Sequence, residues 1–344
     1  MAIIGLGYIG HRHLAMIDAN EEMQLVAVAD VRTPSACDAP AGVPFFSSVD
    51  EMLDAMTDID VLSICTPNGY HADIAVKALN HGINVLMEKP LALNTTDAKR
   101  IGDAAKASGA QVISVFQNRF TPTSQWLKNI VSDGTLGSLT SVVINCQWNR
   151  DDRYYKPGSW HGTADLDGGT LFTQFSHFID IMLWLVGDID ILYATFADYA
   201  HKETTDFEDT GAFTFKTRRD GAIGTFNYTT AVPAENFESS IILIGTRGSV
   251  KVGGQYMSDV IQCKIPGYEM PQLPAPNPPN DYGAYKGSAA NHCFVYDNVA
   301  DVLLRNTTPT AGYADGAAVV SVIERVLAFR KGDFKSPTPL TYRL

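Results

Sequence analysis

The chain has 344 residues, a formal net charge of −12, 45% hydrophobic residues and 19% charged residues. This length predicts two domains, and the composition is typical of a globular protein. No basic stretch indicates a nucleic-acid partner, and no apolar run approaches the roughly 20 residues that span a membrane. No secretion leader opens the chain, and five scattered cysteines lack metal spacing. We therefore expect a cytoplasmic protein with free thiols and no metal site.

The first third of the chain alternates short apolar strands with helices. Strands are expected at 2–4, 25–29, 60–65, 84–87 and 111–115, and helices at 8–20, 48–56, 71–81 and 97–108. Such alternation predicts a parallel sheet covered on both faces, with ligands bound beyond the carboxyl ends of its strands. The sequence thus predicts an α/β fold that begins with a Rossmann dinucleotide-binding domain over residues 1–119.

A glycine motif joins the first strand to the first helix. It reads Gly5-Leu6-Gly7-Tyr8-Ile9-Gly10, and Asp30 follows at the end of the second strand, twenty residues after the last glycine. The glycines allow a tight turn, close approach of a pyrophosphate and close helix packing, while the acid can bind the adenosine ribose. This pattern predicts NAD as the cofactor. Arg32 leaves acceptance of NADP open.

A lysine between a glutamate and a proline ends the strand at 84–87. The motif Glu88-Lys89-Pro90 places Lys89 at the carboxyl edge of the predicted sheet, beside the expected nicotinamide. A lysine there can hydrogen-bond a substrate hydroxyl and stabilise negative charge on its oxygen. The alternative is an ordinary surface lysine at a strand end.

The pattern changes near residue 120. A helix is expected at 122–132, followed by strands at 140–148, 190–199, 210–216, 223–230, 237–244 and 249–252. One helix at 170–185 lies among these strands, a Pro-rich loop occupies 265–280, and a final helix spans 311–330. Many of the strands alternate polar and apolar residues. Residues 120–344 are therefore predicted to form an α+β domain with a large, mainly antiparallel open sheet.

The predicted helix at 170–185 carries a histidine that is a candidate general base. Gly168 and Gly169 open the helix, and Thr173, His177 and Asp180 would share one of its faces. The ordinary pKa of an imidazole, about 6.5, suits proton transfer near neutral pH. The alternative is a core histidine whose hydrogen bond is made by Asp180.

Together these motifs resemble the Gfo/Idh/MocA family of sugar oxidoreductases. The resemblance rests on the glycine motif, Thr66-Pro67-Asn68 with His71, Glu88-Lys89-Pro90, and His177 with Asp180. It implies that Lys89 and His177 are the catalytic pair. The family often has an aspartate where this chain has Thr173, which cannot act as a base, so His177 is the expected proton acceptor.

Several local strings resemble one group within that family, the bacterial UDP-N-acetylglucosaminuronate 3-dehydrogenases of the WlbA/WbpB type. They include Gly7-Tyr8-Ile9-Gly10-His11-Arg12-His13, Gln117-Asn118-Arg119 and Ser159-Trp160-His161-Gly162-Thr163. The resemblance implies oxidation of the sugar C3 hydroxyl in surface-polysaccharide biosynthesis. It also implies a homodimer or homotetramer.

The candidate site residues form two sets. Those expected to contact NAD are Gly5, Gly7, Tyr8, Ile9, Gly10, Asp30, Thr66, Pro67, Asn68, His71, Glu88 and Lys89. Those expected to contact the substrate are Arg119, Arg150, Arg153, Tyr155, Trp160, Thr173, His177 and Asn291. Arginines suit the diphosphate and carboxylate of such a substrate, although the basic segment at 150–160 could also be a solvated loop. Tyr282, Lys286, Ser288 and His292 could contact the nucleotide together with Asn291, or serve only to cap a helix.

Two other functions stay open at this point. One is a dehydrogenase of the same family that acts on inositol or a free aldose, which would need no diphosphate site. The other is a non-catalytic NAD-binding sensor or regulator, for which an acid–base pair would have no use. His11 and His13 are interpreted as packing residues near the phosphate turn, because positions i and i+2 of a helix point to different sides.

Overall fold

The computed structural model describes residues 1–281 and 286–330. The chain divides into two compact units. The first, here called the N-terminal unit, comprises Met1–Phe120 and Ala289–Ser321. The second unit comprises Thr121–Ser288 and the chain from Val322 onward. The sequence predicted one boundary, after residue 119. In the structure, residues 289–321 also belong to the N-terminal unit.

The described part of the N-terminal unit contains a six-stranded parallel sheet with the strand order β3-β2-β1-β4-β5-β6. This is the strand order of a Rossmann fold, as predicted. The strands are β1 (Ala2–Ile4), β2 (Ala27–Ala29), β3 (Phe45–Phe46), β4 (Val61–Ile64), β5 (Asn84–Met87) and β6 (Val112–Ser114).

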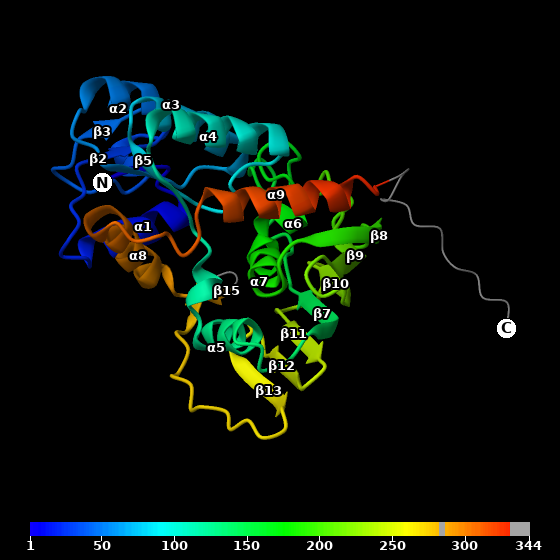
Figure 1. Ribbon diagram of the computed structural model, residues 1–344. Helices are drawn as coiled ribbons and strands as arrows, with labels where there is room; N and C mark the ends of the chain where they lie inside the picture. Colours follow the sequence, from blue (N-terminus) through cyan, green and yellow to red (C-terminus); the bar gives the residue numbers. More distant parts are fainter. Residues whose placement is uncertain (282–285, 331–344) are drawn as a thin grey trace. The chain divides into compact units, whose positions relative to one another are not determined.

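Helices cover both faces of this sheet (Figure 1). One face carries α2 (Val49–Ala55), α3 (His71–Asn80) and α4 (Thr95–Ser108), and the other carries α1 (Tyr8–Asp18) and α8 (His292–Arg305). The helix starts follow the expected chemistry: Ser48 accepts the Glu51 N–H at 3.2 Å, and Asn94 accepts the Asp97 N–H at 2.8 Å. The helix α8 was not predicted.

The parallel register places the candidate cofactor residues at one edge of the sheet. Ile4 pairs with Ala29 and Ile64, and Ile64 pairs with Met87. These strands therefore end together, and the glycine motif, Asp30, the 66–68 loop and Glu88 follow their last residues. Strands that are buried throughout, such as β4, explain why this half of the sequence reads as short apolar runs.

The second unit contains, within its described residues, a seven-stranded sheet in the order β13-β12-β11-β7-β10-β9-β8. Within the described strands of this second sheet, only the β7–β10 pair is parallel, so the prediction of a mainly antiparallel sheet is confirmed. The strands are β7 (Leu139–Gln147), β8 (Ile189–Ala197), β9 (Thr210–Thr217), β10 (Ile223–Thr229), β11 (Glu238–Gly245), β12 (Ser249–Gly253) and β13 (Asp259–Lys264).

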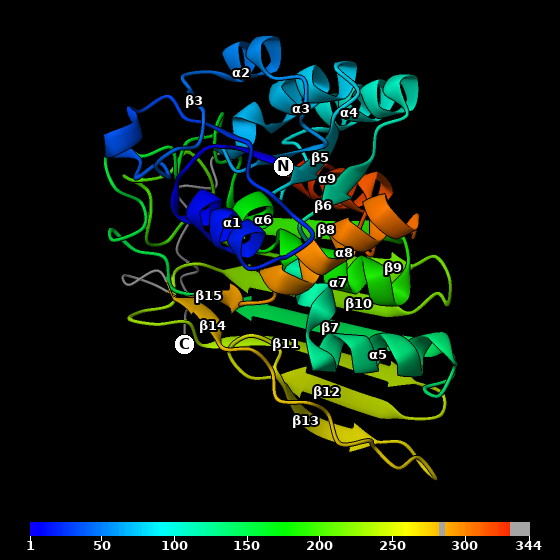
Figure 2. The same ribbon diagram turned by 90° about the vertical axis from the view of Figure 1, so that its left-hand side faces the viewer.

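One face of this sheet is covered by α5 (Pro122–Ser132) and α7 (Ser176–Val186), as Figure 2 shows. The alternating burial of β10, where Gly224, Phe226 and Tyr228 are buried, fits a sheet that packs on one side. The strand β13 was not predicted, because its residues are mostly exposed and carry no apolar alternation. No helix in the described ranges is both long and apolar enough to cross a bilayer.

The predicted continuous helix at 170–185 is wrong. The chain forms a short α6 (Thr170–Thr173) and then α7, because the Phe175 N–H bonds to the Thr170 carbonyl, five residues back, at 3.0 Å. The Phe175 ring is fully buried, with its centroid 5.7 Å from those of Trp148 and Tyr228. Thr173 therefore does not share one continuous helical face with His177 and Asp180.

The last elements are β14 (Pro279–Asp281), β15 (Lys286–Ala289) and α9 (Tyr313–Leu327). The predicted loop at 265–280 has no helix or strand from 265 to 278, whereas Pro279 and Asn280 belong to β14, where the prediction is wrong. The boundary between the two units falls inside α9, after Ser321.

Candidate functional site

The glycine motif builds a turn that can hold a pyrophosphate. Gly5 has a φ of +89°, and a Cβ at this position would lie 2.7 Å from the Cys65 carbonyl oxygen. A Cβ on Gly10 would lie 1.9 Å from the Gly5 oxygen, which shows how closely α1 approaches the turn. Gly7, by contrast, has no atom within 4 Å of that position and leaves the space open. No side chain caps the start of α1, so its N–H groups face this space.

Asp30 lies beside this turn and is nearly fully buried. Its Oδ2 accepts the Leu6 N–H at 2.7 Å, and Arg32 forms a two-pronged ion pair with both carboxylate oxygens at 2.9 and 2.8 Å. Burial raises the pKa of this carboxyl group, but the hydrogen bonds from Arg32 and Leu6 outweigh it and hold the pKa below its usual value. A charged acceptor thus stands where ribose hydroxyls are expected.

The 66–68 loop forms the next part of the edge. The Thr66 hydroxyl is buried and has no hydrogen-bond partner among the described residues. The ring of His71 is fully buried, with Nδ1 2.8 Å from the Pro90 oxygen and Nε2 2.9 Å from the Thr66 oxygen. His71 therefore connects the 66–68 loop to the turn that follows β5. Because its ring is buried, His71 would influence a bound cofactor only by holding these two segments in place.

Lys89 lies directly beyond β5 and is half-buried. Its backbone N–H donates to Oε2 of Glu88 at 3.1 Å, and its peptide bond to Pro90 is cis. Glu88 itself is 6% exposed, and its other carboxylate oxygen faces two histidines inside the unit. Lys89 is therefore partly accessible at the end of β5, whereas Glu88 is nearly fully buried.

These residues fit an NAD molecule. The open space at Gly7 and the uncapped start of α1 suit the pyrophosphate, and Asp30 suits the ribose. The unpartnered Thr66 hydroxyl offers a further polar contact at the same sheet edge. Tyr8, whose side chain is 74% exposed, and Ile9 belong to the same turn.

The second unit holds the histidine that the sequence singled out. His177 lies in the first turn of α7 and is 5% exposed, and Asp180 is 1% exposed. Before it, the Thr173 hydroxyl donates to the Asp167 carboxylate, whose second oxygen accepts the Gly162 N–H at 2.8 Å. Asp167 was not singled out from the sequence. It places a buried carboxylate beside the Thr173 hydroxyl.

The basic segment at 150–160 is divided between the core and the surface. The Arg150 guanidinium is 4% exposed and lies 4.8 Å from the Trp148 ring centroid and 5.2 Å from that of Tyr154. Arg153 has a half-exposed side chain and forms an ion pair with Asp151 at 2.7 Å. Tyr155 is buried against Phe207, a placement that fits core packing.

The other candidate substrate residues are placed as follows. The Trp160 ring stacks on His161, with ring centroids 3.9 Å apart. Arg119 is buried in the N-terminal unit and bonds to Asp315 at 2.7 Å. The Asn291 N–H donates to the Gln117 side chain at 3.1 Å. Tyr282 lies outside the described residues, and only the backbone of Lys286 and Ser288, in β15, is described.

Two buried groups among the described residues contain enough histidine and acid to hold a metal ion. One is His13, Glu88 and His292; the other is Asp198, His201 and Asp209. In the second group, Asp209 lies 3.2 Å from His201 Nδ1 and accepts the N–H groups of Tyr199 and Ala200 at 3.0 and 2.7 Å. Through these contacts, the second group stabilises the loop between β8 and β9.

Comparison with protein families identifies both parts of the chain. Residues 1–116 match the oxidoreductase family model GFO_IDH_MocA, described as an NAD-binding Rossmann fold. Residues 124–251 match the GFO/IDH/MocA C-terminal domain.

Two solved structures share the fold over nearly the whole chain. The WlbA dehydrogenase from Bordetella pertussis, solved with NADH and UDP-GlcNAcA, is 29% identical, covers 95% of both chains and has a TM-score of 0.84. The WlbA dehydrogenase from Chromobacterium violaceum, with the same ligands, is 27% identical, covers 95% of this chain and 92% of that one, and has a TM-score of 0.83. A curated relative, inositol 2-dehydrogenase from Rhizobium meliloti, is 33% identical over 147 residues, which are 41% of this chain and 43% of the relative.

Proposed function

The chain belongs to the Gfo/Idh/MocA family of oxidoreductases, and we propose that it oxidises the C3 hydroxyl of a UDP-N-acetylhexosaminuronate to a ketone. An NAD-dependent sugar dehydrogenase is what the family, the cofactor fit and the relatives support in common. The choice of substrate is carried by the likeness to the WlbA dehydrogenases, which extends over 95% of this chain. Surface-polysaccharide biosynthesis is the proposed setting.

In this proposal, His177 accepts the proton of the ring hydroxyl. Its imidazole is nearly buried in the first turn of α7, and imidazole is the side chain that most often serves as a general base. The Thr173 hydroxyl donates a hydrogen bond to the Asp167 carboxylate in the segment before α7, and a threonine hydroxyl does not act as a base.

Lys89 supplies the positive charge at the same oxygen. Its ammonium group donates a hydrogen bond to the hydroxyl and stabilises the alkoxide that develops as the proton leaves. When bound, NAD supplies the hydride acceptor, nicotinamide C4. The chain's own residues contribute position and charge, and the product is a 3-keto sugar.

The anionic groups of the substrate need cations that are already held in place. We propose that Arg150 and Arg153 bind the uronate or diphosphate, with Trp160 as an apolar surface beside them. Arg150 is kept rigid by its aromatic neighbours, whereas Arg153 would exchange its exposed ion pair with Asp151 for the substrate anion. Tyr155 is left out of this set because its ring packs against Phe207 and it carries no positive charge for an anion.

A second candidate, a dehydrogenase of inositol or a free aldose, is favoured by the 33% identity to inositol 2-dehydrogenase. That match covers less than half of either chain, whereas the match to the WlbA dehydrogenases is nearly complete. A non-catalytic sensor is disfavoured because both Lys89 and His177 are present.

A single-turnover experiment separates these functions. NAD-loaded protein is mixed in turn with UDP-N-acetylglucosaminuronate, myo-inositol and glucose, and NADH fluorescence is followed. The proposal predicts a signal with the nucleotide sugar alone, and Arg153→Gln should raise the KM for it. A signal only with a free sugar would contradict the proposed substrate, and silence with all three despite NAD binding would favour the sensor.

A further inference from the structure

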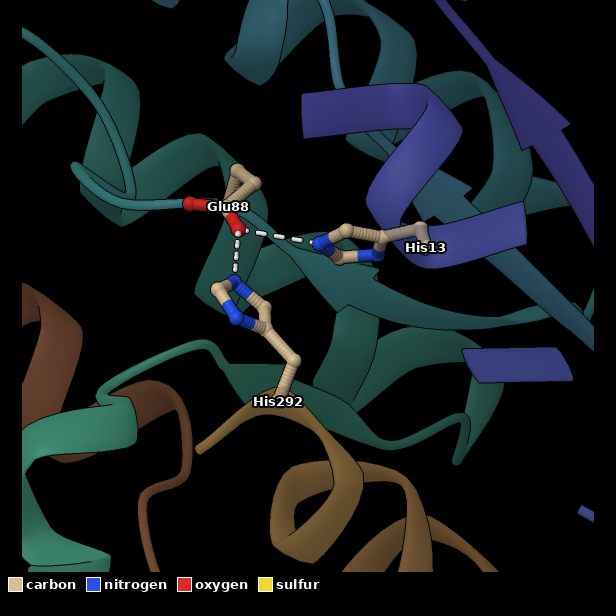
Figure 3. A group of neighbouring side chains, drawn as sticks. All are labelled: His13, Glu88 and His292. Carbon is tan, nitrogen blue, oxygen red and sulfur yellow. Dashed lines mark hydrogen bonds and ion pairs between the residues drawn. The ribbon is translucent and has the colours of Figure 1, made fainter. Parts of the chain in front are cut away.

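Three side chains from distant parts of the chain meet inside the N-terminal unit (Figure 3). His13 comes from α1, Glu88 follows β5, and His292 begins α8. Oε1 of Glu88 lies 2.9 Å from His13 Nε2 and 3.4 Å from His292 Nε2. The three residues are 0, 6 and 2% exposed, so water screens these contacts little.

The distances and charges show that His13 and Glu88 form an ion pair. Nδ1 of His13 lies 2.7 Å from the Ser63 hydroxyl and 2.9 Å from that of Tyr296, so both ring nitrogens have oxygen partners, as an imidazolium needs. Burial alone would lower the pKa of His13, but its contacts with Cys65 and Glu88 raise it to about 10. Burial likewise raises the pKa of Glu88, yet the hydrogen bonds from His13 and His292 hold it well below its usual value.

His292 is the neutral member of the cluster. Burial, together with the nearby positive charge of His13, lowers the pKa of its imidazole. It therefore donates one hydrogen bond through Nε2 to the Glu88 carboxylate. Because it carries no charge, removing its side chain breaks one contact without leaving a buried ion unpaired.

The geometry favours this hydrogen-bonded state over a metal site. Two ligands of a tetrahedral zinc ion, each about 2.05 Å from the metal, would stand about 3.3 Å apart. The 2.9 Å between His13 and Glu88 is shorter and suits a charge-assisted hydrogen bond.

The cluster also contacts the backbone of Lys89. While Oε1 of Glu88 is held by the two histidines, Oε2 accepts the Lys89 N–H at 3.1 Å. On the other side of Lys89, the Pro90 carbonyl oxygen lies 2.8 Å from His71 Nδ1. Buried side chains thus hold the backbone on both sides of a residue whose own side chain is half-buried.

We propose that Glu88 is a positioning residue for Lys89, and that His292, carried back to the N-terminal unit by α8, fixes the Glu88 carboxylate in the orientation this role requires. The proposal rests on the function of Lys89 proposed above. It replaces the expectation that Glu88 contacts the cofactor, and it gives α8 a part in the site.

Two substitutions of His292 test this. His292→Leu keeps the volume but removes the donor, whereas His292→Gln returns an N–H near the position of Nε2. We expect His292→Leu to lower kcat roughly 10- to 100-fold, because a small displacement of a catalytic group has effects of this size. We expect His292→Gln to recover most of this loss. NADH affinity, measured by fluorescence, should stay near that of the wild type in both variants.

A second readout does not depend on turnover. The rate at which acetic anhydride modifies Lys89, followed by mass spectrometry, should change severalfold in His292→Leu and return toward the wild-type rate in His292→Gln. Lys99, which is 75% exposed on α4, is the internal control and should not change.

The outcomes are distinct. An unchanged kcat in His292→Leu, an equal loss in both variants, or a parallel loss of NADH binding would overturn the positioning role. If the wild type oxidises none of the tested sugars, the proposed function fails, and the labelling rates alone decide the inference: equal Lys89 rates in the wild type and His292→Leu would overturn it.

Discussion

At the scale of single residues, the proposed mechanism depends on two side chains, those of His177 and Lys89, that act on the same substrate hydroxyl. His177 and Lys89 belong to different units, and each is part of a motif that can be recognised in the sequence. His177 is nearly buried and Lys89 is half-buried, so each side chain is partly shielded from bulk water within its own unit. Electrostatic stabilisation of an alkoxide is stronger where water is excluded.

Alanine variants of this pair should separate chemistry from cofactor binding. We expect Lys89→Ala and His177→Ala each to lower kcat by roughly two to four orders of magnitude, the usual contribution of a positioned acid or base. NAD binding should persist in both, and Lys99→Ala is the matched surface control. Near-normal turnover in either catalytic variant would remove that residue from the mechanism.

Asp30 and Arg32 should set the choice between NAD and NADP. Removing the carboxylate takes away the ribose acceptor and releases the Arg32 guanidinium, which can then bind a 2′-phosphate. We expect Asp30→Ala to weaken NAD binding roughly 10- to 100-fold, in line with about 1.5–3 kcal/mol for a hydrogen bond to a charged group. NADP binding should improve, and Asp30→Ala with Arg32→Ala should cancel that gain. An unchanged ratio of the two affinities would contradict this role.

Residues within a local motif could be predicted, and residues that depend on distant partners could not. The glycine turn follows from its spacing, because turn, phosphate approach and helix packing each need a glycine there. The contact between Glu88 and His292 has no such signal. Glu88 and His292 stand 204 positions apart, and no spacing rule connects them.

At the scale of elements, the buried ion pair of His13 and Glu88 joins α1 to the turn after β5, and its contribution to folding stability should depend on pH. The folded-state pKa of His13, about 10, lies above the ordinary value of 6.5. Its contribution is therefore fully present below about pH 6.5 and is lost as the pH rises through 10. One group of this kind gives at most about 1.4 kcal/mol per pH unit between these limits.

The thermal unfolding midpoint should therefore fall between pH 7 and pH 10 more steeply in the wild type than in the double variant His13→Asn, Glu88→Gln. The double variant is the suitable reference because it removes both charges together and leaves no unpaired buried ion. Parallel pH profiles for the two proteins would show that His13 is not charged in the folded state.

Element types were predictable where the pattern was strong. Helices were predicted at 48–56 and 97–108, and the structure has α2 and α4 there, capped by Ser48 and Asn94. The break between α6 and α7 was missed because a run of apolar residues with helical periodicity gives no sign of it. Packing of the Phe175 ring against Trp148 and Tyr228 supplies the tertiary preference that interrupts the helix.

At the scale of the whole molecule, the alternation of strands and helices was enough to predict a Rossmann unit, and polar–apolar alternation was enough for the second sheet. The return of α8 to the N-terminal unit was not predictable, because a helix that packs far from its sequence neighbours leaves no local trace. The dimer or tetramer implied by the family resemblance stays a prediction. The strand β8 exposes Leu192 and Tyr193.

In the proposed mechanism, a hydride leaves C3 of a UDP-N-acetylhexosaminuronate, His177 accepts the hydroxyl proton, and Lys89 stabilises the alkoxide that develops. The most direct measurement supplies UDP-N-acetylglucosaminuronate with deuterium at C3, together with NAD, and analyses the reduced cofactor by mass spectrometry. The proposed mechanism predicts that the NADH carries the deuterium and that deuterated NADH forms more slowly in Lys89→Ala. NADH without deuterium, or deuterium that remains on the sugar, would contradict oxidation at C3.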